Sequence, residues 1–240
     1  MIAKHPIAIV FLFLAGMVGT RADDDLPAKP TRHQVLDVEG WKVQVDERLL
    51  KGPQRELGTK ALKLLEGRLL DIVIVLPPDK VARLQEVPIW LDLSHGALKS
   101  MQYHPSESWL KDKGYDPAMA RGFHIPDASQ FSSARHHHTQ PWATLHELAH
   151  AYHDQVLGFE KEEILQAWKQ FCQSGKYQKV RHINGQQIPH YALTNQKEFF
   201  AEMTESYFGL NDFYPFHRDD LRQAEPEIFA LMKTIWGPLP

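Results

Sequence analysis

The sequence predicts an α+β fold with a small mixed sheet and a helical C-terminal half. Three observations lead to this expectation. A strand pattern precedes a long amphipathic helix, two short apolar runs bounded by turn residues follow, and helical periodicity dominates beyond residue 141. With 240 residues and a hydrophobic content of 43%, the chain is long enough to bury one packed core.

The first 22 residues are typical of a secretory signal peptide. Lys4 precedes an apolar run over residues 7–18, and small residues then lead to three aspartates at 23–25. The apolar run is well short of the roughly 20 residues that a membrane-spanning helix needs. We therefore expect a secreted or periplasmic protein with no stable membrane insertion after cleavage.

Beyond the predicted signal peptide, the amino-acid composition divides the chain into a short polar segment and one long remainder. Residues 23–32 are polar and contain prolines, which predicts a flexible leader. Residues 33–240 contain no internal repeat and no low-complexity tract, so we expect a single domain. Within it, residues 33–88 are expected to form a small N-terminal lobe.

Charge and cysteine content exclude several classes of function. Lysine and arginine total 27 against 30 aspartates and glutamates, so no broad basic surface indicates a nucleic acid as a partner. Cys172 is the only cysteine, so no intrachain disulfide can form. Its apolar neighbours favour a small buried residue over a nucleophile.

The N-terminal half carries the strand signals. Trp41, Val43 and Val45 alternate with polar residues, which predicts a half-buried strand. Helical spacing over residues 54–74 predicts a long amphipathic helix that ends before two prolines. Residues 89–93 and 122–125 are further candidate strands. The run over residues 122–126 could be the edge strand that pairs with an extended substrate.

The C-terminal half is marked by helix and turn signals. Pro141 suits the first turn of a helix that runs to about residue 157. Asn184 and Gly185 between two extended runs predict a β-hairpin. Further helices are expected over residues 161–173, 195–210 and 226–236.

Residues 146–150 read HELAH, a pattern that fits a zinc site on a helix. Because residues four apart lie one turn above each other, His146 and His150 present their imidazoles to one point. Glu147 is offset by about 100 degrees, which keeps it out of the ligand set but within reach of an activated water. We therefore expect the two histidines to bind one Zn²⁺ ion and Glu147 to act as general base.

A zinc hydrolase of this kind needs a third protein ligand. The metzincin pattern fails, because His153 stands where glycine is expected and Val156 where a third histidine belongs. The better candidate is Glu198, which shares one helical face with Glu202. One of these carboxylates can bind zinc while the other hydrogen-bonds a ligand histidine. Alternative third ligands are His182 and His190, in the predicted hairpin.

Tyr191 lies where the predicted hairpin ends, just before the helix that carries the two glutamates. A phenol that donates to a developing oxyanion would add to the stabilisation that zinc provides. The alternative is a tyrosine that packs at the end of a strand.

These elements together resemble the peptidase domain of anthrax lethal factor and its relatives, which include the secreted Pro-Pro endopeptidases of clostridia. The resemblance rests on HELAH, then Tyr191, then EFFAE at residues 198–202, and it covers roughly residues 142–208. It implies a zincin-like fold of the gluzincin type. By this resemblance Glu198 is the third zinc ligand, Tyr191 polarises the scissile carbonyl and Glu202 supports the site from outside the ligand set.

Two polar features near HELAH have weaker signals. His136, His137 and His138 form a run ahead of the helix. A solvated loop is the first interpretation, a rim of the substrate groove the second and a separate metal site the third. Asp154 lies one turn past His150 and could orient a neighbour, although a solvated helix end is the more common outcome.

The function that the sequence predicts is a secreted zinc-dependent endopeptidase that hydrolyses peptide bonds with an activated water. An alternative is a zinc-bearing extracellular protein that binds peptides without turnover. In a third interpretation HELAH is accidental and the protein has a structural role. The partner in the first two cases is a protein or peptide.

Overall fold

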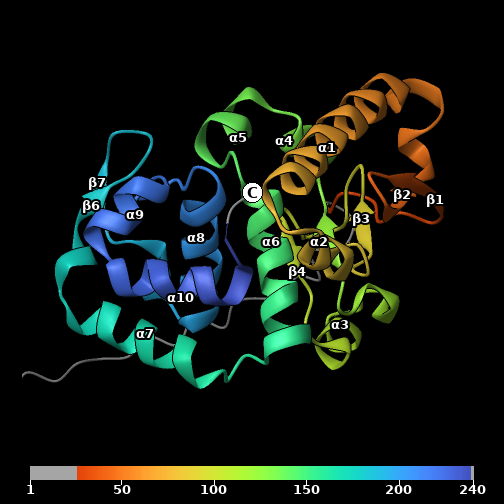
Figure 1. Ribbon diagram of the computed structural model, residues 1–240. Helices are drawn as coiled ribbons and strands as arrows, with labels where there is room; N and C mark the ends of the chain where they lie inside the picture. The colour runs from red at the N-terminus through yellow and green to blue at the C-terminus, as the bar shows by residue number, and fades with distance from the viewer. Residues whose placement is uncertain (1–25, 239–240) are drawn as a thin grey trace, which may run out of the picture.

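The computed structural model, which describes residues 26–238, has a five-stranded mixed sheet, a two-stranded sheet and helices. The larger sheet and α1 form one half of the molecule, helices α7 to α10 form the other, and α6 runs between them (Figure 1). The α+β class and the helical C-terminal half are confirmed. The predicted signal peptide over residues 1–22 lies outside the described residues.

The five-stranded sheet has the order β1-β2-β3-β5-β4. Its strands β2, β3 and β5 are parallel, whereas β1 and β4 pair antiparallel at the two edges. The strands are β1 (His33–Val38), β2 (Trp41–Asp46), β3 (Ile89–Leu91), β4 (Gln102–Tyr103) and β5 (Phe123–Ile125). The expectation that residues 122–126 form an edge strand was wrong, because β4 covers β5. A two-residue strand has too little alternation to be recognised in the sequence.

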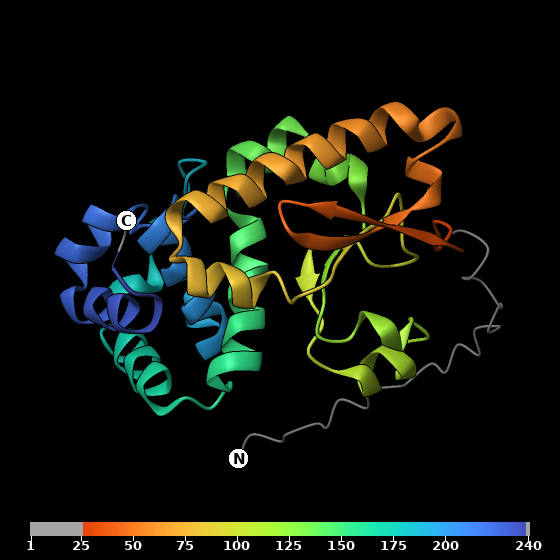
Figure 2. The ribbon, with the colours of Figure 1, turned by 45° about the vertical axis from the view of Figure 1, so that its right-hand side comes forward.

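Helix α1 (Arg55–Val75) covers one face of this sheet, where it lies above the strands in Figure 2. Its buried residues recur every three or four positions and pack on the inward side chains of β2, β3 and β5. The first proline after α1 is Pro77, and Pro78 begins the unpredicted α2 (Pro78–Leu84). The apolar core between α1 and the sheet is the main core of the protein, and it continues to α10. The sheet and the C-terminal helices therefore share one core.

The opposite face of the sheet carries a much thinner layer. It consists of loops with α3 (Glu107–Asp112) and a 3₁₀ turn (Pro117–Met119), which Figure 2 shows below the strands. The buried apolar side chains of this layer are Trp90, Leu110 and Met119.

Residues 26–32 have no helix or strand, but they differ from the flexible leader expected over residues 23–32. The Gly96 N–H donates to the Pro27 carbonyl at 3.0 Å, and the Ser94 hydroxyl donates to the Ala28 carbonyl at 2.7 Å. Lys29 Nζ also donates to the Gly114 carbonyl at 2.8 Å. The described part of the leader is therefore held against the thin layer.

The C-terminal half contains the expected helices and one α-helix, α9, that was not expected. Those expected are α6 (Ala143–Tyr152), which continues as a π-helical turn (His153–Leu157), α7 (Glu162–Gln173), α8 (Gln196–Phe208) and α10 (Pro226–Trp236). The hairpin β6 (Val180–Arg181) and β7 (Gln187–Ile188) is present but shorter than expected, and α9 (Arg218–Ala224) was missed. Over residues 26–238, no helix is both long and apolar enough to cross a bilayer.

Two glycines of α1 have different surroundings and test how closely this helix is packed. A Cβ atom at Gly58 would lie 1.9 Å from the Leu49 carbonyl oxygen, whereas nothing lies within 4 Å at Gly67. We expect Gly58→Ala to lower the free energy of unfolding by roughly 1–3 kcal/mol, because backbone must shift. Gly67→Ala should raise it by about 0.5–1 kcal/mol. Urea denaturation measures the free energy of unfolding of both variants. Equal changes in the two variants would contradict the close packing at Gly58.

Candidate metal centre

His146 and His150 lie one turn apart on α6, and their Nε2 atoms face the same carboxylate oxygen. Glu198 Oε2 is 3.1 Å from His146 Nε2 and 3.2 Å from His150 Nε2. The two imidazole rings are 4.7 Å apart between centroids and nearly perpendicular, at 82°. These three side chains form a group that could hold a metal ion.

The spacing of the three donor atoms fits zinc. Ligand atoms bound to a tetrahedral zinc ion at about 2.0–2.1 Å are roughly 3.3 Å apart, close to both separations at Glu198 Oε2. Two imidazole nitrogens and one carboxylate oxygen are also a donor set that zinc accepts. Burial opposes ionisation of Glu198, but hydrogen bonds with His146 and His150 outweigh it and hold the pKa of Glu198 well below its usual value.

Helix α8 places Glu198 because its N-terminus is fixed by a cap. The Asn195 side chain accepts hydrogen bonds from the backbone N–H groups of Lys197 and Glu198, at 2.9 and 3.0 Å. The apolar face of α8 then packs on α6 in the main core. The sequence-predicted ligands are thus brought together from two helices about fifty residues apart in the chain.

The other nitrogen of His146 is hydrogen-bonded by a residue that the sequence analysis missed. His146 Nδ1 donates to Glu205 Oε1 at 2.7 Å, whereas Glu202 Oε1 is 3.7 Å away. The hydrogen bond to a ligand histidine that was expected of Glu202 is therefore made by Glu205. A signal was available, because Glu205 lies seven residues after Glu198 and so shares its helical face.

Glu202 occupies a buried acidic region next to His146. Its side chain is 4% exposed, and its Oε2 atom has no hydrogen-bond partner within residues 26–238. Burial, together with the charges of Asp212 and Glu205, raises the pKa of Glu202 well above its usual value. Burial and the charge of Glu205 similarly raise the pKa of Asp212 to about 7.

Glu147 is held by the edge strand. Its Oε2 atom accepts the backbone N–H of Tyr103 at 2.7 Å, so strand β4 fixes the carboxylate beside the two histidines. Burial raises the pKa of Glu147 above its usual value. The Tyr103 hydroxyl in turn donates to Asp154 Oδ2 at 2.6 Å, in the π-helical turn that extends α6. Asp154 therefore orients a neighbour, and the more common outcome of a solvated helix end does not hold here.

The three donors and Glu147 open into one pocket of about 540 Å³. Its wall includes residues 99–103 of the segment that leads into β4, and Tyr191 from the turn before α8. Tyr191 is 48% exposed and lines the pocket together with Glu147 and the three donors. An extended ligand in this pocket would lie beside residues 99–103, which lead into the edge strand β4.

The remaining histidines near HELAH lie apart from the donor set. Residues 136–138 belong to the short helix α5 (Ala134–Thr139), not to a loop, and they diverge. His136 lines the pocket, His137 lies 3.4 Å from Arg68 of α1, and His138 donates to the carbonyl of its own turn.

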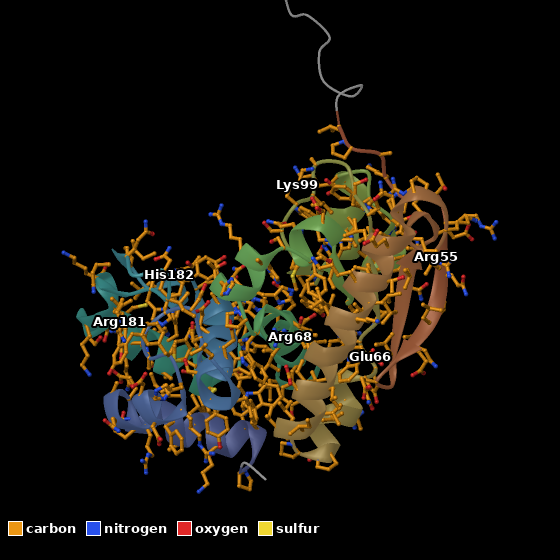
Figure 3. All side chains as sticks on the ribbon, turned by 90° about the horizontal axis from the view of Figure 1, so that it is seen from above. Arg55, Glu66, Arg68, Lys99, Arg181 and His182 are labelled. Atoms are coloured by element: carbon orange, nitrogen blue, oxygen red, sulfur yellow. The ribbon has the colours of Figure 1, made fainter. Side chains whose placement is uncertain are left out.

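The alternative third ligands are engaged elsewhere. His190 is buried, and its Nδ1 accepts the Ala192 N–H. His182 forms an isolated β-bridge with Phe213 in the hairpin region. Figure 3 shows His182 beside Arg181 and across the molecule from Arg55 and Glu66 of α1. Neither histidine belongs to the metal-holding group around Glu198.

Comparisons with protein-family models, with curated proteins and with solved structures find no match to this chain.

The three glutamates of α8 are expected to differ in their effect on zinc affinity. Glu198→Ala removes a donor atom and should weaken zinc binding most. Glu205→Gln should weaken it by roughly 10- to 100-fold, because the carboxylate no longer fixes His146. Glu202→Gln should have the smallest effect, since this carboxylate lies 3.7 Å from the same nitrogen. Competition against a chromophoric chelator gives the three zinc affinities. A larger loss of affinity in Glu202→Gln than in Glu205→Gln would show that Glu202, not Glu205, orients His146.

Proposed function

We propose that this protein is a secreted zinc-dependent endopeptidase of the gluzincin type, with a zincin-like fold. The observation that carries the proposal is the convergence of His146 Nε2, His150 Nε2 and Glu198 Oε2 at separations of 3.1 and 3.2 Å. Glu147 and Tyr191 line the same pocket, so a base and an oxyanion donor accompany the donor set. The lethal factor-like order of HELAH, Tyr191 and EFFAE supports the same conclusion.

The chain's own residues would each contribute one step to peptide hydrolysis. Zinc at the three donors supplies Lewis-acid activation of a water molecule and of the scissile carbonyl. Glu147, held beside the donors by the Tyr103 N–H, removes a proton from the attacking water and delivers it to the leaving amine. Tyr191 donates a hydrogen bond to the oxygen on which negative charge develops.

The pocket supports a peptide as substrate. Its wall includes residues 99–103, the segment that leads into the edge strand β4. An extended chain can add to such an edge through backbone hydrogen bonds. We propose secretion on the pattern of residues 1–22, which would bring the enzyme to extracellular or periplasmic proteins and peptides.

Glu147→Gln is expected to keep zinc and lose hydrolysis. The amide cannot accept the proton of water, so turnover should fall by roughly 10²- to 10⁴-fold. The assay is cleavage of a diverse peptide library followed by mass spectrometry, with zinc content measured on the same sample. Glu163→Gln, at an exposed position on α7, is the matched control and should cleave as the wild type does. Full cleavage by Glu147→Gln would refute the mechanism, and zinc-dependent peptide binding without any cleavage by the wild type would favour the non-catalytic alternative.

Tyr191→Phe is expected to lower kcat by roughly 10²- to 10³-fold with little change in KM, because the lost hydrogen bond forms in the transition state. The measurement is steady-state kinetics on a peptide that the library identifies. Tyr214→Phe is a suitable control, since Tyr214 does not line the pocket. Unchanged kcat in Tyr191→Phe would show that this tyrosine only packs beside the site.

A further inference from the structure

A second group of side chains that could hold a metal ion lies on the sheet face opposite α1. It consists of Asp92, directly after β3, His95 in the following loop and His124 in the middle of β5. Asp92 Oδ2 is 2.6 Å from His95 Nδ1 and 2.8 Å from His124 Nε2. None of the three residues lines the pocket of the first centre. We call this group the Asp92 cluster.

The Asp92 cluster is fully enclosed. Asp92 and His124 have no exposed surface, and His95 is 5% exposed. Within residues 26–238 the ion-pair partners of Asp92 are all histidines, with no lysine or arginine within 4 Å. Burying a carboxylate is unfavourable unless a cation or strong hydrogen bonds compensate its charge. A divalent metal ion would provide that charge.

The geometry of the Asp92 cluster parallels that of the first centre. The His95 and His124 rings are 4.8 Å apart between centroids at 79°, against 4.7 Å and 82° for the HELAH pair. In both centres one carboxylate oxygen lies between two ring nitrogens that face it. The separations in the Asp92 cluster are shorter, so metal binding would require the carboxylate to withdraw by roughly half an ångström, to a ligand spacing of about 3.3 Å.

Two further histidines occupy the positions that orient metal ligands. His33, at the start of β1, donates from Nε2 to the other oxygen of Asp92 at 2.7 Å. His104 Nε2 lies 3.2 Å from His124 Nδ1, the nitrogen that faces away from Asp92. Ligand histidines commonly hydrogen-bond through their second nitrogen to such a partner, and this fixes the ring and its tautomer.

The position of the Asp92 cluster indicates that a metal ion there would stabilise the thin layer on this face of the sheet. Among residues 26–238, the buried apolar side chains of the layer over this face are Trp90, Leu110 and Met119. An apolar core of that size contributes little stability, and small layers are commonly completed by a metal or a disulfide. No intrachain disulfide is possible with one cysteine. The cluster joins β3, β5 and the loop after β3 at the base of this layer.

We propose that Asp92, His95 and His124 bind a second, structural metal ion, with zinc as the ion that the nitrogen and oxygen donors favour. This inference does not rest on the proposed peptidase activity, because the donors are separate from the first centre. The competing interpretation is a metal-free hydrogen-bonded network of the same residues.

The first test removes the HELAH centre and counts the zinc that remains. Purified full-length chain with His146→Ala and His150→Ala, loaded with zinc and dialysed, is expected to retain about one zinc ion per chain, against about two in the wild type. Adding Asp92→Asn or His124→Ala should remove that ion, whereas adding His138→Ala, at an exposed position, should not. Elemental analysis gives the stoichiometry, and a double variant without bound zinc would overturn the proposal.

A second test avoids variants of the Asp92 cluster that fail to fold. The same double variant, titrated with Co²⁺ after chelator treatment, should show the visible absorption of low-symmetry cobalt, which excess zinc removes. Zinc should also raise the melting temperature of the double variant by roughly 5–10 °C. Absence of both signals would leave the hydrogen-bonded network as the correct description.

Discussion

The packing of α8 on α6 is the interaction on which the candidate metal centre at His146, His150 and Glu198 depends. HELAH supplies two donors from one helix, but the third donor lies on a helix that begins near residue 196. The close approach of the two helix ends is possible because Gly209, after α8, has no side chain. A Cβ atom there would lie 2.1 Å from the ring of Trp142, the residue that precedes α6. With this end fixed and the Asn195 cap at the other, Glu198 has little freedom to leave the histidines.

The acidic residues around His146 follow from the same packing. Glu205 hydrogen-bonds His146 at 2.7 Å, and Glu202 and Asp212 are enclosed nearby. A buried group of carboxylates repels itself, and this repulsion adds to burial in raising the pKa values of Glu202 and Asp212. A cation at the donors would relieve that repulsion. Packing α8 against α6 brings these carboxylates together at an electrostatic cost. Because a bound cation would remove that cost, the repulsion increases the affinity of the centre for a metal ion.

The sequence predicted the parts of this protein that depend on local periodicity. Helices α1, α6, α8 and α10 and the pair His146 and His150 follow from spacing along one element. Strand β4 could not be predicted, because two residues carry no alternation and its position depends on pairing with β5. Glu205 was within reach of the helical pattern, but three glutamates on one face do not show which of them meets His146.

The Asp92 cluster could be predicted from the sequence even less than β4 or the role of Glu205. Asp92, His95 and His124 come together because β3 and β5 pair in parallel, with Trp90 opposite His124. Nothing in the local sequence specifies that register.

The two centres are linked through the edge of the sheet. His124 of the Asp92 cluster lies on β5, which pairs with β4, and the Tyr103 N–H of β4 holds the Glu147 carboxylate. The register places Gln102 opposite His124 and Tyr103 opposite Phe123, so any shift of β5 is transmitted to the donor that orients Glu147. Since β4 has only two residues, its own hydrogen bonds cannot resist such a shift. A metal ion that fixes His124 to Asp92 would therefore also stabilise the position of the Glu147 carboxylate, although the two sites share no ligand.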